Sequence, residues 1–131
     1  MLLSIDEKDE RPIYLQLANQ IKEQVSQGIL KPGDELPSVR DVAQSLGINL
    51  HTVRGAYLRL RDEGLIDLRL GRKARITRQP PAVEKDSAGN LKPRIRELIT
   101  DALLKGLAPD DIRDLVSEVL DDIQADRKEH E

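Results

Sequence analysis

The sequence predicts a mainly α-helical protein with two modules, and three observations support this fold class. Apolar residues recur at spacings of three and four in five separate stretches, which is the period of amphipathic helices. Two short strand-like runs flank one turn at Gly71 and predict a β-hairpin. Between the third and fourth helical stretches, residues 79–92 contain two adjacent prolines and little apolar periodicity. We therefore expect a first module at residues 1–78, a linker at 79–92 and a helical tail at 93–131.

The first helix of the first module is expected at about residues 12–28. Pro12 suits a first helical turn, and the stretch that follows the helix contains two prolines and Gly33, which favour a turn. The buried face of this helix is expected to carry Tyr14, Leu17, Ile21 and Val25.

Two shorter helices are expected next. Ser38 with Asp41 resembles a capping box, and it begins a helix that ends before Gly47. Asn49 can cap a third helix, which stops at Gly64. The buried face of the third helix is expected to consist of Val53, Ala56, Tyr57 and Leu60.

A basic hairpin completes the first module. Strand-like runs at residues 65–70 and 74–78 enclose a tip made of Gly71, Arg72 and Lys73. Three helices followed by such a hairpin outline a winged helix-turn-helix. A basic tip suits the minor groove or the flanking phosphates of DNA. The alternative is an edge hairpin that Lys and Arg keep soluble.

The tail is expected to form two amphipathic helices, at about residues 93–106 and from Pro109 to beyond residue 123. A pair this short cannot bury both apolar stripes alone, so we expect the same hairpin of a second chain to cover them in a homodimer. Packing against the first module of the same chain is the alternative. The expected dimerisation residues are Ile95, Leu98, Ile99, Leu103, Ile112, Leu115, Val116, Val119, Leu120 and Ile123.

Charge is distributed unevenly along the chain. The formal net charge is -3, but residues 1–78 hold 13 basic and 11 acidic side chains, and residues 79–131 hold 8 and 13. Residues 50–78 alone carry 8 basic and 3 acidic groups. This asymmetry is typical of a polyanion-binding module joined to a separate acidic element, and a solvated surface with uneven charge is the alternative.

The start of the third helix has the chemistry of a DNA-reading element. A recognition helix buries one face and leaves its N-terminal turn free to enter a major groove. The guanidinium of Arg54 can pair with guanine O6 and N7, and Asn49 and Thr52 can donate to phosphate or a base edge. Gly55 is unusual inside a helix, and it either permits close approach of a phosphate backbone or is merely tolerated.

Three ordered motifs give the first module a family resemblance. The chain contains G-x-L-x-P-G-x-x-L-P-S-x-R at residues 28–40, L-G-I-x-x-x-T-V-x-x-A-Y at 46–57, and L-x-x-E-G-L-I at 60–66. On these motifs it resembles the GntR family of bacterial transcription regulators. Its short helical tail is similar to that of the YtrA-like branch, which implies a tail that serves dimerisation.

The resemblance also implies which residues contact DNA. They are the Arg after the L-P-S motif, the polar residues that open the third helix, the Arg after T-V and the Gly at the wing tip. In this sequence these positions are Arg40, Asn49, His51, Thr52, Arg54 and Gly71. The wing lacks the second Gly and the aromatic residue of the usual family pattern, so contacts by Arg72 and Lys73 follow less directly from the resemblance.

The sequence offers little for catalysis or metal binding. It has no cysteine, and its two histidines, His51 and His130, have no convergent partners for a zinc or general-base site. The acidic residues between 121 and 131 lack the spacing and the Gly of a calcium loop. We therefore expect no enzyme activity, no metal and no cofactor.

The expected function is sequence-specific binding of double-stranded DNA by a transcriptional regulator, a repressor that acts as a homodimer on an inverted-repeat operator. Tyr14 and Tyr57 are both expected to face inward, which leaves no aromatic platform for single-stranded bases. The apolar runs are too short for a membrane span, so we expect a cytoplasmic protein. The alternative function is a protein-interaction adaptor, and no effector pocket can be inferred from the sequence.

Overall fold

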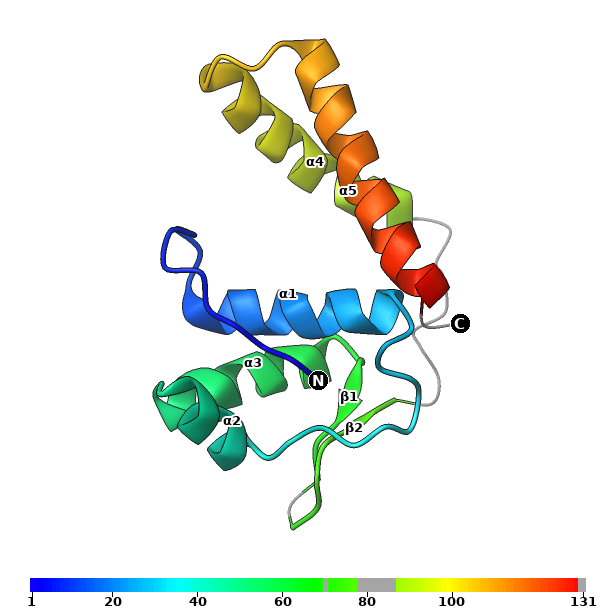
Figure 1. Ribbon diagram of the computed structural model, residues 1–131. Helices are drawn as coiled ribbons and strands as arrows, with labels where there is room; N and C mark the ends of the chain where they lie inside the picture. The colour runs from blue at the N-terminus through cyan, green and yellow to red at the C-terminus, as the bar shows by residue number, and fades with distance from the viewer. Residues whose placement is uncertain (70, 78–86, 130–131) are drawn as a thin grey trace. The chain divides into compact units, whose positions relative to one another are not determined.

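The computed structural model describes residues 1–69, 71–77 and 87–129, with the side chains of 87–90 and 126–129 left aside. Its contacts divide the chain into two compact units, one that includes residues 1–77 and one that includes residues 87–126. The expected fold class is confirmed, because three helices and a small hairpin are followed by two further helices (Figure 1).

The first unit consists of α1 (Ile13–Ser26), α2 (Val39–Leu46), α3 (Leu50–Asp62) and the antiparallel strands β1 (Ile66–Asp67) and β2 (Arg75–Ile76). Both α1 and α2 pack against α3, which lies at the centre of the unit. The core is continuous over all five elements. Its fully buried large side chains are Tyr57, Leu17, Ile21, Leu36, Leu60, Ile66 and Val53.

Local caps determine where α2 and α3 begin. The Ser38 hydroxyl accepts a hydrogen bond from the Asp41 N–H at 3.0 Å, and the Asn49 side chain accepts one from the His51 N–H at 2.8 Å. Gly47 ends α2 in the left-handed conformation, with φ of 66°. The expected caps are therefore confirmed, and each N-cap is worth about 1 kcal/mol of helix stability.

Tyr57 ties α3 to the start of α2. Its ring is 1% exposed, and its hydroxyl donates a 2.6 Å hydrogen bond to the Pro37 carbonyl, directly before the Ser38 cap. Burial raises the pKa of the Tyr57 hydroxyl above its usual value. The hydroxyl therefore stays protonated and remains a donor.

Tyr14 lies on the face of α1 that meets α3, as expected, but it is not buried there, because the structure leaves this residue 36% exposed. Tyr14 lies near the start of α1, beside Gly55 of α3: a Cβ built on Gly55 would lie 3.9 Å from the Tyr14 Cβ. Since Gly55 has no side chain, it does not cover the ring. The sequence argument against aromatic stacking therefore applies to Tyr57 alone.

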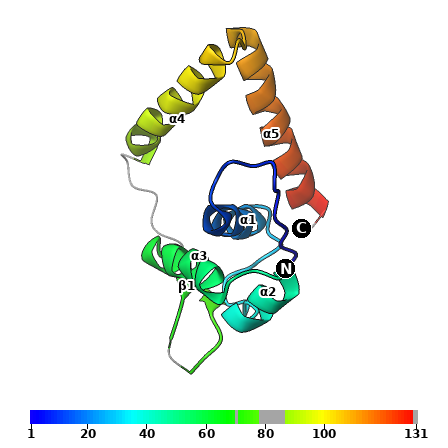
Figure 2. The same cartoon turned by 90° about the vertical axis from the view of Figure 1, so that its left-hand side faces the viewer.

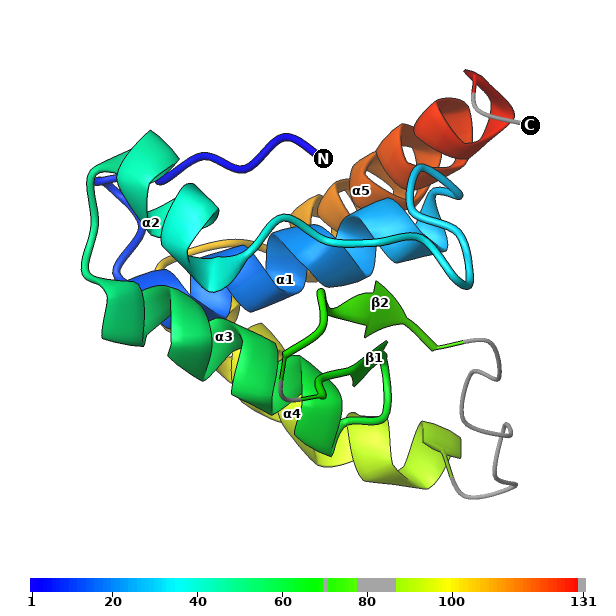
Figure 3. The same cartoon turned by 90° about the horizontal axis from the view of Figure 1, so that it is seen from below.

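The hairpin is shorter than the sequence predicts. The expected strands at 65–70 and 74–78 shrink to two residues each, with Ile66 opposite Ile76, and positions 70 and 78 lie outside the described residues. The tip turn takes up the end of the expected first strand, because the Arg72 N–H donates to the Arg69 carbonyl at 3.2 Å. On its other side, β2 also pairs with the loop between α1 and α2 (Figure 3). There the Leu36 N–H donates to the Ala74 carbonyl at 2.8 Å, and the Ile76 N–H donates to the Asp34 carbonyl at 2.9 Å.

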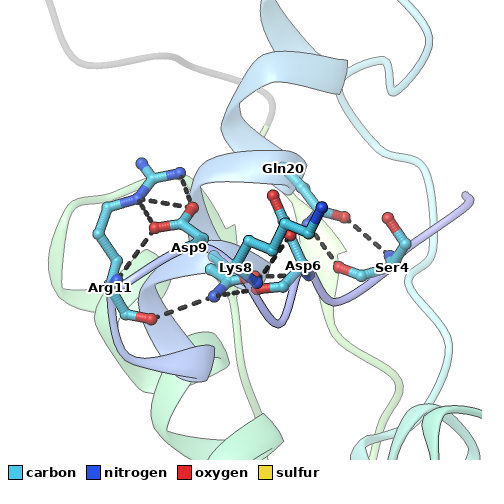
Figure 4. A network of polar contacts seen from close by, with 7 residues as sticks. Ser4, Asp6, Lys8, Asp9, Arg11 and Gln20 are labelled. Carbon is cyan, nitrogen blue, oxygen red and sulfur yellow. Dashed lines mark hydrogen bonds and ion pairs between the residues drawn. The ribbon is translucent and has the colours of Figure 1, made fainter.

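An extended arm, residues 2–11, lies along α1 and was not predicted. Gln20 pairs with the Ser4 backbone in both directions, accepting from its N–H at 2.9 Å and donating to its carbonyl at 2.6 Å (Figure 4). Gln16 makes the same pair of bonds with Asp6, and Gln24 donates to the Leu2 carbonyl. Four residues of helix rise about 6 Å and two residues of extended chain about 6.6 Å, so the glutamines match alternate arm residues.

The end of the arm is closed by a local ion pair. The Arg11 guanidinium donates hydrogen bonds to the Asp9 carboxylate, as Figure 4 shows. These bonds lower the pKa of Asp9 to about 2.

The second unit consists of α4 (Ser87–Leu104) and α5 (Pro109–Glu129), which diverge from a turn at Gly106 (Figure 2). The expected boundary at residue 93 is wrong for the helix, since α4 begins at Ser87 and contains Pro93. A proline inside a helix removes one backbone hydrogen bond, and the helix formers Ala, Leu and Lys among residues 87–92 favour the extra turns. The α5 start at Pro109 is as expected, and there the Ala108 N–H donates to the Asp111 carboxylate at 2.8 Å.

Candidate nucleic-acid interface

Helix α3 has one buried face and one exposed face. Val53, Ala56, Tyr57 and Leu60 are buried, as the sequence predicts. Leu50, His51 and Arg54 are exposed at the start of α3, and Leu50 and Arg54 are one helical turn apart on the same face. Thr52 is half-buried and lies two residues, or about 200° of helix, away from Arg54. The structure therefore groups His51 with Arg54 and separates Thr52 from them.

Asn49 is already engaged by the fold. Its Oδ1 accepts the His51 N–H at 2.8 Å, which is the cap that starts α3. The amide Nδ2 has two N–H donors that this cap does not use. Asn49 is thus suited to donate to a phosphate or to a base acceptor, and less suited to the paired donor and acceptor contact that asparagine makes with adenine.

Arg40 extends from the first turn of α2. It is exposed, and within the described residues neither Arg40 nor Arg54 forms an ion pair. Because Ser38 caps the helix and Tyr57 holds Pro37, the backbone that carries Arg40 is fixed to α3. Two unpaired guanidinium groups, on two connected helices, are available to anions.

The hairpin tip carries most of the remaining free positive charge of the first unit. Gly71 has φ of 78°, which favours glycine, and the Arg72 N–H closes the turn on the Arg69 carbonyl at 3.2 Å. Arg69, Arg72 and Lys73 are exposed. Together with Asp67 and Arg75 they line one shallow depression, which has the charge to hold a phosphate.

Two basic groups of the hairpin have acidic neighbours. Arg75 forms a 2.6 Å ion pair with Glu35 of the adjacent loop. Lys73 lines a second depression, whose lining also includes Asp34, Glu35 and Asp41. Arg69 and Arg72 are therefore the hairpin cations with the fewest acidic neighbours among the described residues.

Gly55 faces α1 and not a ligand. Its open side is directed at Tyr14, and a Cβ there would make ordinary van der Waals contact at 3.9 Å. Of the two readings that the sequence leaves open, close approach of a phosphate and simple tolerance, the geometry favours the second.

Among the described residues no group of three or more His, Cys, Asp or Glu is placed to hold a metal ion, and His130 lies outside them. No helix there is long and apolar enough to cross a membrane.

Comparison with known proteins establishes the family. The family model described as bacterial regulatory proteins, gntR family, matches residues 13–76. The HTH-type transcriptional repressor YtrA of Bacillus subtilis is 33% identical over 128 residues, which are 97% of this chain and 98% of YtrA. The chain belongs to the GntR family.

Solved structures agree with this GntR assignment. A transcriptional antiterminator from Listeria monocytogenes is 30% identical, with a TM-score of 0.82 over 95% of this chain and 93% of the other. YtrA from Sulfolobus acidocaldarius, a GntR-family transcription factor, is 37% identical, with a TM-score of 0.56 over 92% and 97%. The family resemblance read from the three motifs is confirmed, and the protein is a DNA-binding regulator of transcription.

The GntR match runs from the first residue of α1 to the last residue of β2, so it coincides with the described helices and hairpin of the first unit. Three features of this GntR regulator lie outside the sequence prediction: the exposed Leu50, the glutamines that hold the arm, and Leu91, which adds a turn to the apolar stripe of α4. The spacing of Gln16, Gln20 and Gln24 is the signal that could have found the arm.

Proposed function

We propose that this GntR regulator represses transcription as a homodimer bound to an inverted repeat in duplex DNA. The observation that carries the proposal is the exposed face of α3, where Arg54 has no ion-pair partner among the described residues and lies beside His51. An α-helix with one buried face and a basic, exposed N-terminal turn fits a major groove.

Each candidate residue has a role that its position supports. Arg54 pairs with guanine in the major groove, and Arg40 holds a phosphate or guanine from the start of α2. His51 and the Nδ2 amide of Asn49 donate to base or phosphate acceptors, and Thr52 contacts the backbone at the edge of the helix.

The hairpin supplies affinity and little selectivity. Gly71 keeps the tip narrow, and Arg72 and Lys73 contact phosphates beside the groove that α3 reads. Such contacts strengthen binding to all sequences alike.

The second unit joins two copies. Eight of the ten expected dimerisation residues are exposed in the single chain, and the other two, Ile112 and Ile123, are half-buried. A hairpin with apolar stripes exposed on both helices is unfavourable in water, since each large side chain left uncovered forgoes about 1.5–3 kcal/mol of burial. The same stripes of a second copy are complementary by two-fold symmetry.

The repressor assignment draws on the relatives. The Bacillus subtilis protein that matches almost the whole chain is a transcriptional repressor. A dimer that covers an operator can exclude other proteins from it.

Selection of bound sites from random duplexes by the full chain tests the proposal. We expect enrichment of two half-sites related by a two-fold axis, about 10 base pairs apart centre to centre or a multiple of this. The result that contradicts the proposal is failure to enrich any inverted repeat while light scattering shows a dimer. If the affinity of the chain for its partner changed neither with salt concentration nor in Arg54→Ala, the result would instead favour a protein-interaction adaptor.

A further inference from the structure

Leu50 is an apolar residue in a polar setting. It is the first residue of α3, it is 39% exposed, and it does not belong to the core cluster of the first unit. Among the large apolar side chains on α2, α3 and the described part of the hairpin, it is the exposed one. Packing in the core therefore does not explain a leucine at this position.

The position of Leu50 relative to Arg54 is informative. The two residues are four apart, so their side chains lie on one face of α3, about 6 Å apart along the helix axis. Asn49, directly before Leu50, uses its Oδ1 for the helix cap. The N-terminal turn of α3 thus presents an isobutyl group where a base edge would lie.

Only one group in the major groove is apolar, and it is the 5-methyl group of thymine. A leucine side chain neither donates nor accepts hydrogen bonds. Against guanine O6 and N7 or cytosine N4 it would displace water without replacing its hydrogen bonds, which is unfavourable. Against thymine it buries a methyl group, which is favourable.

We infer that Leu50 is a specificity-determining residue that selects thymine in each half-site by van der Waals contact with its 5-methyl group. This inference rests on the proposed function, because it requires α3 to lie in the major groove. Because 6 Å along α3 covers at most about two base-pair steps of 3.4 Å, the selected thymine lies within two base pairs of the guanine that Arg54 contacts.

Replacement of thymine by deoxyuridine tests the inference because it removes the methyl group alone. Each thymine of the selected duplex is replaced in turn, symmetrically in both half-sites, and the affinity of the full chain is measured by fluorescence anisotropy. We expect one thymine position at which the replacement lowers affinity by about fourfold per half-site, the value for burial of one methyl group.

Protein variants then assign the effect to a side chain. In Leu50→Ala, duplexes with thymine and with deoxyuridine at that position are expected to bind equally. His51→Ala, on the same turn, is the matched control and should keep the fourfold difference. Alanine is the best helix former, so Leu50→Ala should fold, and thermal unfolding checks this.

The outcomes separate the inference from the proposed function. If no inverted repeat is enriched in the selection, both are wrong. If a repeat is enriched but no thymine shows a penalty, or the penalty persists in Leu50→Ala, the inference alone is overturned.

Discussion

Gly55 lies on the side of α3 that meets α1, with space for one methyl group beside Tyr14. Its backbone is helical, and glycine in a helix is less stable than alanine by about 0.5–1 kcal/mol. We expect Gly55→Ala to stabilise the first unit by this amount, and thermal or urea unfolding of the full chain measures it.

Gly47→Ala is the matched control for this substitution. Gly47 has φ of 66°, where a Cβ costs about 1–2 kcal/mol, so this variant should lose stability. If Gly55→Ala weakened DNA binding without loss of stability, Gly55 would contact DNA and our placement of it would be wrong.

The hydroxyl of Tyr57 contributes a hydrogen bond that a phenylalanine at this position could not make. In Tyr57→Phe the Pro37 carbonyl loses a donor that lies 2.6 Å away at a half-buried site. We expect a loss of about 0.5–1.5 kcal/mol in the free energy of unfolding, the usual net value of one hydrogen bond. Tyr14→Phe, at an exposed ring, should change it by less than about 0.5 kcal/mol. Equal effects of the two variants would contradict this role for the Tyr57 hydroxyl.

Single residues differ in how far the sequence predicts them. Ser38 and Asn49 were predicted as caps because capping chemistry depends on the next two or three residues only. The exposure of Tyr14 is not predicted, because its neighbour on α3, Gly55, is 41 positions away in the chain. Periodicity places Tyr14 on the correct face of α1, but it contains no information on the missing side chain opposite.

Glutamine side chains of α1 hold the arm against the helix. Gln20→Met keeps the size of the side chain and removes both hydrogen bonds to Ser4. We expect the Ser4 amide to lose its protection against hydrogen exchange, and the free energy of unfolding to fall by about 1–2 kcal/mol. Gln44→Met, on the exposed side of α2, is the control and should leave Ser4 exchange unchanged. Unchanged protection of Ser4 in Gln20→Met would refute the pairing.

Two arginines of the hairpin are expected to differ in how much they contribute to the salt dependence of DNA binding. For Arg72→Ala we expect the slope of log K against log salt to decrease by about 0.9, since one phosphate contact is lost. Arg75→Ala should decrease it less, because Arg75 is already paired with Glu35 at 2.6 Å. Anisotropy titrations of the selected duplex at several salt concentrations measure both slopes. A larger change for Arg75→Ala would mean that the ion pair opens on DNA.

Helices of the first unit were predicted closely, and α4 was not. The caps and glycines around α2 and α3 are strong local signals. Residues 87–92 carry no such signal, and Pro93 is read from sequence as a helix start. The structure continues the helix through Pro93, and this adds Leu91 to the apolar stripe. The predicted strands are too long because an apolar and polar alternation does not show where the tip turn begins, which the Arg72 N–H to Arg69 carbonyl bond sets at residue 69.

Across the whole chain, positive charge is concentrated in the first unit and negative charge in the second half. The net charge of -3 combines the basic stretch at 50–78 with an acidic second half. The acidic second unit repels DNA, so it leaves the basic surface of α3 and the hairpin as the favoured contact. Repulsion between two acidic tails weakens their association, and the apolar stripes must overcome it; added salt should therefore strengthen the dimer while it weakens DNA binding.

At the scale of the whole molecule, we expect the tail to determine how tightly the proposed dimer binds its operator. Leu98 lies on the predicted dimerisation stripe of α4 and is 70% exposed in the single chain. In Leu98→Asp a charge would be buried at the centre of the proposed interface, which costs several kcal/mol without a partner. We expect light scattering to show a monomer, and the affinity for the full inverted repeat to fall at least tenfold because two linked half-sites no longer bind together.

Leu104→Asp is the control for Leu98→Asp, because it adds the same charge to α4 outside the dimerisation stripe. Leu104 is more exposed than Leu98, at 83%, but it lies on the opposite side of α4 from the stripe. We expect Leu104→Asp to leave both the dimer and the affinity for the operator unchanged. Because the first unit contains α3 and the hairpin, affinity for a single half-site should be the same for both variants. If Leu98→Asp stayed dimeric, the contact between copies would lie elsewhere, and the exposed stripe would need a different partner.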